Sequence, residues 1–209
     1  ATFHDGTPVT SEDVAFSIKR MIDPTFGSPQ IGQFNSITDA VASDDTTVVV
    51  TTKGAYPVLL AQLTKLSIVP KHVVEAVSKD EFNISPVGSG PYKFETWNRG
   101  VEVLVTRNDD YWGVKGEFPQ VAFRAVPDGS TRIANLQAGT TDLASNLDND
   151  LAAQLEGSGA GKVLPVRGER LAYFALNVNK EPLDDARVRL AIAHAIDKKG
   201  IVEGILGSY

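Results

Sequence analysis

The sequence predicts a mixed α/β fold, and three observations lead to that prediction. Amphipathic segments with the 3.6-residue period of a helix occur along the whole chain. Between them lie short segments, rich in Val and Thr, that alternate with the period of a strand. The two kinds of segment follow one another without a regular β-α alternation, which favours a mixed architecture over a doubly wound parallel sheet.

The clearest helix follows Thr10-Ser11-Glu12-Asp13. Thr10 or Ser11 can cap it, and the two acids stand in the first turn, where the helix dipole favours them. Asp23-Pro24 ends this helix, because the residue before a proline avoids helical backbone angles. One apolar stripe lies between these signals, formed by Val14, Ile18, Met21 and Ile22.

Other helices have weaker signals. One begins at a cap of Ser130 or Thr131 and ends at Gly139, and another begins at a cap of Asp184. The remaining helical patterns cover residues 59–66, 71–79, 151–155 and 201–206.

Strands are predicted in two hairpins and three single segments. Ser43-Asp44-Asp45 joins the strands of the first hairpin, and Asn98-Arg99-Gly100 forms the loop of the second. The hairpin strands are Ile37–Ala42 with Thr47–Thr52 and Tyr92–Trp97 with Val101–Thr106, and the single strands are Val121–Val126, Val163–Val166 and Leu171–Val178.

Composition excludes several classes of protein. The chain has 209 residues, 42% of them hydrophobic and 22% charged, as in an ordinary folded protein. A net charge of −6 without a Lys/Arg cluster disfavours nucleic acid as a partner. The absence of cysteine excludes thiol catalysis, cysteine-zinc sites and disulfides. The longest apolar stretch, Tyr56–Pro70, is too short to span a bilayer and contains Lys65.

Two glycine- or acid-rich motifs resemble ligand loops and fail in detail. Gly157–Lys162 lacks the glycine and the hydroxyl of a phosphate loop, since Glu156 and Val163 stand at those positions. We expect a flexible surface turn there. Asp148-Asn149-Asp150 lacks the glycine that a calcium loop needs at its sixth position, so we expect a helix start.

The sequence shows no pattern typical of catalysis. The three histidines have no metal-ligand spacing, and the adjacent acid pairs stand in loops, where carboxylates are ordinarily hydrated. Ser89 lacks the surroundings of a nucleophile elbow. The aromatic residues could line a ligand groove or fill a core, and these are Trp97, Tyr111, Trp112, Tyr173 and Phe174.

Four blocks in order along the chain carry a family resemblance. They are Phe3–Pro8 with Thr10–Ser17, Val87–Phe94 continuing to Arg107–Gly113, Ala138–Leu143, and Leu176-Asn177 with Pro182–Arg189 and Ala195-Ile196-Asp197. Together they resemble the family 5 extracellular solute-binding proteins, the dipeptide-, oligopeptide- and nickel-type receptors of ABC importers.

The resemblance implies a type II periplasmic-binding-protein-like fold of the peptide-receptor cluster, with ligand enclosed between two lobes. Residues 1–86 resemble an accessory subdomain of the first lobe, and residues 87–170 resemble part of the main first lobe. Residues 171–209 resemble a crossing strand and the start of the second lobe. We therefore expect an internal fragment, with the signal peptide and most of the second lobe outside this chain.

The function implied by the resemblance is capture of peptides or similar small solutes for delivery to ABC transporter permease subunits. The implied receptor is a monomer in the periplasm, or lipid-anchored outside the cell, and uses no cofactor, metal or catalytic residue. An alternative is the ligand-sensing module of a transcription regulator with the same fold. The residues expected to contact ligand are Ala144, Ser145, Asn146, Leu147 and Tyr173, with Asn146 the foremost polar contact.

Overall fold

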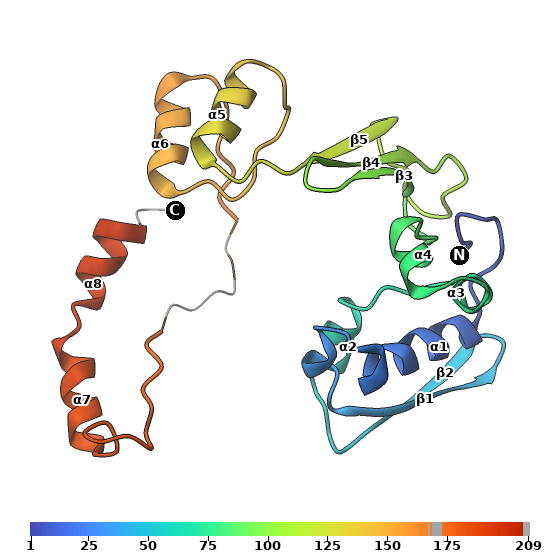
Figure 1. Cartoon of the computed structure of the whole chain (residues 1–209), viewed down its shortest axis with the longest axis horizontal. Coiled ribbons are helices and arrows are strands. Elements are labelled where there is room, and N and C mark those ends of the chain that lie inside the picture. Colours follow the sequence, from blue (N-terminus) through green and yellow to red (C-terminus); the bar gives the residue numbers. More distant parts are fainter. Residues whose placement is uncertain (167, 169–172, 207–209) are drawn as a thin grey trace. The chain divides into compact units, whose positions relative to one another are not determined.

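The computed structural model describes residues 1–166, 168 and 173–206 of the chain. The chain divides into two compact units, Ala1–Ala125 and Val126–Tyr209. Figure 1 shows the succession of elements along the sequence, and each unit is described below by itself.

The first helix of the first unit, α1 (Ser11–Ile22), begins and ends as its sequence predicts. Thr10 is the N-cap, and its hydroxyl and Asp13 form a reciprocal capping box. The helix ends at Asp23, whose carboxylate then accepts the N–H of Thr25 at 2.8 Å and begins a short 3-10 turn, η1 (Pro24–Phe26). A second 3-10 turn is η2 (Ile31–Gln33).

The core of the first unit lies between α1 and a hairpin. The strands β1 (Ile37–Asp44) and β2 (Thr47–Thr52) pair antiparallel, which confirms the predicted hairpin. Figure 1 shows α1 lying along this hairpin. The apolar side of α1 packs on β1, and the buried residues of this core are Ala15, Ile18, Phe34, Ile37 and Ala40.

Three short helices follow the hairpin: α2 (Leu59–Leu63), α3 (Lys71–Ala76) and α4 (Lys79–Ile84). The sequence predicts one helix over residues 71–79, whereas the chain forms α3 and then α4. Ser78 explains the break, because its hydroxyl accepts the N–H of Glu81 at 3.2 Å and starts a new helix.

A histidine ties the beginning of the first unit to the loop that follows α4. The N–H of His4 donates to the Gly88 carbonyl at 2.8 Å, and the N–H of Gly88 donates to His4 Nδ1 at 3.3 Å. Since Nδ1 accepts, the neutral ring carries its proton on Nε2, which lies 3.1 Å from the Gly90 carbonyl. Gly6 has a φ of 87° in the turn that follows His4.

A three-stranded antiparallel sheet completes the first unit. Its strands lie in the order β3 (Tyr92–Asn98), β4 (Glu102–Arg107) and β5 (Gln120–Arg124). Gly100 takes a φ of 76° in the β3–β4 loop, as the predicted hairpin requires.

Helices are the only regular secondary structure of the second unit, within the part of the chain that the structure describes. α5 (Gly129–Gln137) and α6 (Asn149–Ser158) lie side by side (Figure 1) and bury Ile133, Ala152 and Leu155. The other elements are α7 (Ala186–Ala195), α8 (Lys198–Ile201) and a π-helical turn, η3 (Val202–Leu206).

The caps of α5 and α7 differ from the prediction by one to three residues. Asp128, not Ser130 or Thr131, caps α5, since its carboxylate accepts the Thr131 N–H at 2.7 Å. Asp185, not Asp184, caps α7 and accepts the Arg187 N–H at 2.8 Å. At α5 a carboxylate takes the place of the predicted hydroxyl as the acceptor for free N–H groups, and at α7 the second of two adjacent carboxylates is the acceptor.

Two predicted strands are wrong. Residues 163–166 and 173–178 form no strand, because no described segment pairs with them. Residues 171–172 of the second prediction lie outside the described residues. The assignment of residues 1–86, 87–170 and 171–209 to parts of two lobes stays a prediction.

Candidate functional site

The expected ligand-binding segment lies in the loop between α5 and α6. The loop begins with a Schellman motif: the N–H of Gly139 donates to the Leu136 carbonyl at 3.1 Å, and that of Thr140 to the Asn135 carbonyl at 3.0 Å. Gly139 has the positive φ, 69°, that this motif requires. At its other end the loop meets Asp148, the N-cap of α6. The loop thus begins at a hydrogen-bonded helix end, whereas the side chain of Asp148 makes no capping hydrogen bond at the other end.

The middle of this loop contains three exposed and two half-buried residues. Leu143 is 79% exposed, Ser145 and Asn146 are exposed, and Ala144 and Leu147 are half-buried. Within the described part of the chain, the backbone groups of residues 143–145 form no hydrogen bond. Unpaired backbone N–H and C=O groups can pair with the main chain of an extended ligand.

Asn146 differs from its neighbours in backbone conformation. Its φ is 54°, and it is the one non-glycine residue with a positive φ among the described residues. Its carbonyl accepts a hydrogen bond from Arg132 Nη2 at 2.9 Å. The structure therefore holds Asn146 in the left-handed region, with its side chain exposed.

Tyr173, the fifth expected contact, is 82% exposed, and Phe174 is 72% exposed. No described hydrogen bond or ring contact joins Tyr173 to residues 144–147. Residues 144–147 lie together in the loop because they are adjacent in sequence, and contact with ligand stays a prediction for all five residues. Trp97 and Trp112 are also exposed, at 42% and 57%, so these two do not fill a core.

The weaker motifs have structural roles. Gly157 and Ser158 end α6, and Gly159 follows with a φ of 67°, so the expected surface turn begins two residues later than predicted. The expected helix start at Asp148-Asn149-Asp150 is confirmed. The carboxylate of Asp44 accepts the Thr46 N–H at 2.9 Å in a hairpin turn.

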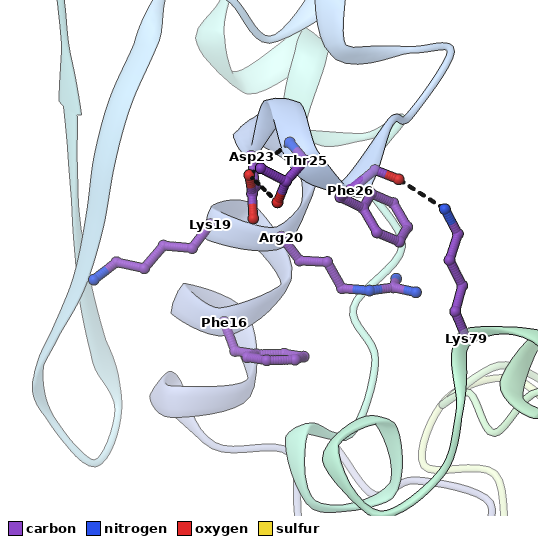
Figure 2. Close-up of a pocket in the computed structure, with 7 residues that line it drawn as sticks. All are labelled: Phe16, Lys19, Arg20, Asp23, Thr25, Phe26 and Lys79. Atoms are coloured by element: carbon purple, nitrogen blue, oxygen red, sulfur yellow. Dashed lines mark hydrogen bonds between the residues drawn. The ribbon is translucent and has the colours of Figure 1, made fainter.

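A hollow of about 450 Å³ lies beside α1 in the first unit (Figure 2). The Arg20 guanidinium stacks 4.0 Å from the Phe26 ring centroid, and Lys79 Nζ lies 4.4 Å from the same centroid. Lys79 Nζ also donates to the Phe26 carbonyl at 2.7 Å. Burial lowers the pKa of Arg20, which remains a cation at any physiological pH. The cluster links η1 to α4 by cation–π contacts.

Metal-ligating side chains do not gather in the described residues: no three of His, Asp or Glu lie close enough to hold an ion. His72 Nε2 lies 2.9 Å from Asp5 Oδ2 as a pair. Among the described helices, none has the length and apolar character needed to cross a bilayer.

Arg132 is the residue of the site that sequence reasoning missed. It stands four residues after the cap Asp128, as Arg189 stands four residues after the cap Asp185. Each arginine donates to the two carbonyls just before its own cap. A repeated Asp-x-x-x-Arg at helix starts was the available signal, although it does not reveal the additional bond to Asn146.

The comparison with known families identifies the chain. A family model described as "Bacterial extracellular solute-binding proteins, family 5 Middle" matches residues 1–209. The chain belongs to this family. The predicted membership and the predicted fold class, mixed α/β and periplasmic-binding-protein-like, are thereby confirmed.

Individual relatives of this family 5 chain are named for different solutes. Heme-binding protein A of Haemophilus influenzae is 28% identical and matches 93% of the chain, and the glutathione-binding protein GsiB of Escherichia coli O1:K1 / APEC is 30% identical and matches 99%. The chain spans about two-fifths of each relative, 39% and 41% of their lengths.

Solved structures of the same family superpose on most of the chain. The receptor MoaA of A. tumefaciens R10 in complex with mannopinic acid has a TM-score of 0.80 at 29% identity, over 97% of this chain and 42% of its own. DppA from Helicobacter pylori, in complex with peptide STSA, has a TM-score of 0.74 at 31% identity, over 97% and 44%.

Proposed function

We propose that this family 5 chain is part of the receptor of an ABC importer, which captures a peptide or similar small solute and passes it unchanged to a membrane permease. The observation that carries the proposal is the segment 143–145, whose backbone N–H and C=O groups have no partner in the described residues. Such groups can hold an extended ligand whatever its side chains. Asn146 adds an exposed amide beside them.

The names of the relatives support a peptide-like ligand without selecting one. One relative is named for glutathione and one solved structure contains peptide STSA, whereas others are named for heme or mannopinic acid. The lobes close on the solute to the extent that the solute binds the closed form better than the open form. We place this receptor in the periplasm, or on a lipid anchor outside the cell, as a monomer that contacts the permease.

The proposal is tested on the complete protein that the gene encodes, by thermal shift against trialanine, reduced glutathione, nickel–histidine and a neutral sugar. A solute at 100 times its dissociation constant adds about 2.7 kcal/mol to the free energy of unfolding. Absence of a shift with every class would contradict the proposal.

Two variants locate the site. Asn146→Gly keeps a residue that tolerates a positive φ and removes the amide, so a loss of affinity reports the side chain alone. Ser145→Ala is paired with Ser130→Ala, a similarly exposed serine on α5. We expect weaker binding of the selected solute in Asn146→Gly and Ser145→Ala and unchanged binding in Ser130→Ala. Equal affinities in all four proteins would show that the ligand lies elsewhere.

A further inference from the structure

Arg132 joins three backbone carbonyls that belong to two separate segments. Its Nη1 donates to the carbonyls of Val126 and Pro127 at 2.7 Å and 2.9 Å, and its Nη2 donates to the Asn146 carbonyl at 2.9 Å. We propose that Arg132 is the positioning residue of the ligand-binding loop: it holds Asn146 so that residues 143–146 present their polar groups to the solute. This inference rests on the proposed function.

The guanidinium geometry suits this role. Its two terminal nitrogens lie in one plane at a fixed separation, so a contact with the entry to α5 also fixes where the Asn146 carbonyl must lie. Hydrogen bonds from a charged donor are stronger than those between neutral groups. A lysine has a single terminal nitrogen and cannot span both segments with the same geometry.

The hydrogen bond from Arg132 matters because of the backbone conformation of Asn146. A residue with a φ of 54° is outside the region that most side chains prefer, and asparagine tolerates it better than most. The carbonyl that Arg132 fixes belongs to this residue, so the contact selects the left-handed conformation and with it the direction of the exposed amide. Arg132 contacts only backbone here and acts through Asn146.

The packing around Arg132 leaves little space for rearrangement. A Cβ added at Gly129 would lie 3.4 Å from Arg132 Nη2 and 2.7 Å from Leu151 Cδ1. The start of α5, the guanidinium and the first turn of α6 are therefore in close contact. Arg132 Nε is buried and has no partner among the described residues, which leaves the Nη groups as the source of the stabilising bonds.

Arg189 supplies a matched control, because it makes the first of these contacts without the second. Its Nη1 donates to the Leu183 and Asp184 carbonyls at 2.8 Å and 2.9 Å, six and five residues before it, as Arg132 does with Val126 and Pro127. Loss of the bonds at a helix entry is therefore common to Arg132→Lys and Arg189→Lys. Only Arg132→Lys also removes the bond to the loop.

The experiment compares these two variants in the complete protein by two measurements. The first is amide hydrogen exchange at Thr140 and Thr141, the residues of the loop whose N–H groups are hydrogen-bonded, and it needs no ligand. The second is the dissociation constant for whichever probe of trialanine, reduced glutathione or nickel–histidine gives the largest thermal shift. We expect Arg132→Lys to speed exchange in the loop and to weaken binding at least about tenfold, equivalent to about 1.4 kcal/mol. Arg189→Lys should leave both measurements within about twofold of the parent, a change of about 0.4 kcal/mol.

Two results would overturn the inference. One is loop exchange in Arg132→Lys that matches Arg189→Lys, since the arginine would then have only the helix-entry role. The other is faster exchange with unchanged affinity in a protein whose Asn146→Gly variant binds weakly. Failure of the proposed function has a different signature, in which every probe leaves the parent protein unshifted while the exchange difference persists.

Discussion

The carboxylate of Asp13 accepts the backbone N–H of Lys71 at 2.9 Å, so a side chain near the start of α1 forms a hydrogen bond with the first residue of α3. The same carboxylate accepts the Thr10 N–H at 2.9 Å and the Thr10 hydroxyl at 2.6 Å. One buried carboxylate thereby accepts hydrogen bonds at the beginnings of two helices, and its bond to Lys71 joins residues 58 positions apart in the sequence.

Asp13→Asn should destabilise the first unit by about 1–3 kcal/mol. The amide retains one acceptor but turns an NH2 group toward donors that need acceptors, which leaves a buried polar group unpaired. Urea denaturation measures the change. Asp45→Asn, in an exposed hairpin turn, is the control and should stay within about 0.5 kcal/mol of the parent. Equal midpoints for the two variants would contradict this account of Asp13.

Stability should fall as the pH falls below about 6.5. Burial lowers the pKa of His4 below its usual 6.5, against the weaker effects of the Gly90 hydrogen bond and Asp5, while Lys93 also lowers it. Just below pH 6.5, His4 therefore binds a proton more readily in the unfolded chain than in the folded chain, and acid favours unfolding. Protonated Nδ1 also cannot accept the Gly88 N–H.

His4→Gln removes this titration, and its unfolding free energy should vary less between pH 5 and 6.5 than that of the parent, over roughly the range where histidine titrates. The carboxylates act at lower pH. Burial raises the pKa of Asp13, but the hydrogen bonds from Thr10 and Lys71 outweigh it and hold the pKa below 3.8. The stability from Asp13 is present above 3.8 and is lost only as the pH falls through its lower folded value. Identical slopes for parent and His4→Gln would show that another group titrates.

Two glycines at the end of α6 should respond in opposite directions to alanine. Gly157→Ala should stabilise by about 0.4–1 kcal/mol, because the residue is helical and a Cβ there meets nothing within 4 Å. Gly159→Ala should destabilise by roughly 1–2 kcal/mol, because its φ of 67° is left-handed. Thermal unfolding of both variants decides the matter, and a shift of the same sign in both would contradict the assigned end of α6.

The core between α1 and the β1–β2 hairpin should be sensitive to lost volume. Ile18 is 2% exposed, and Ile18→Ala should cost about 2–5 kcal/mol in unfolding free energy. Leu60→Ala, at a residue that is 78% exposed, is the matched control and should change little. A small effect at Ile18, measured by urea denaturation, would mean that α1 does not pack as described.

Local signals account for what the sequence could predict. The stripe of α1 and its cap at Thr10 lie within one window, as does the β3–β4 hairpin around Gly100. The segment at 163–166 has the composition of a strand, but a strand also needs a neighbouring strand, which composition does not reveal. For the candidate site, family resemblance predicts the loop at 144–147. The role of Arg132 could not be predicted from the sequence, because its acceptors are main-chain carbonyls, which every residue possesses.

The pairing of His4 with Gly88 brings together two points of the chain that enclose α1, the hairpin and three further helices. The polypeptide enters and leaves this region at one place. A segment whose two ends lie next to each other can gain or lose residues without changing the separation of the segments that flank it. Insertions and deletions between His4 and Gly88 can therefore be accepted during evolution, as they are in a long surface loop, while the β3–β5 sheet keeps its geometry.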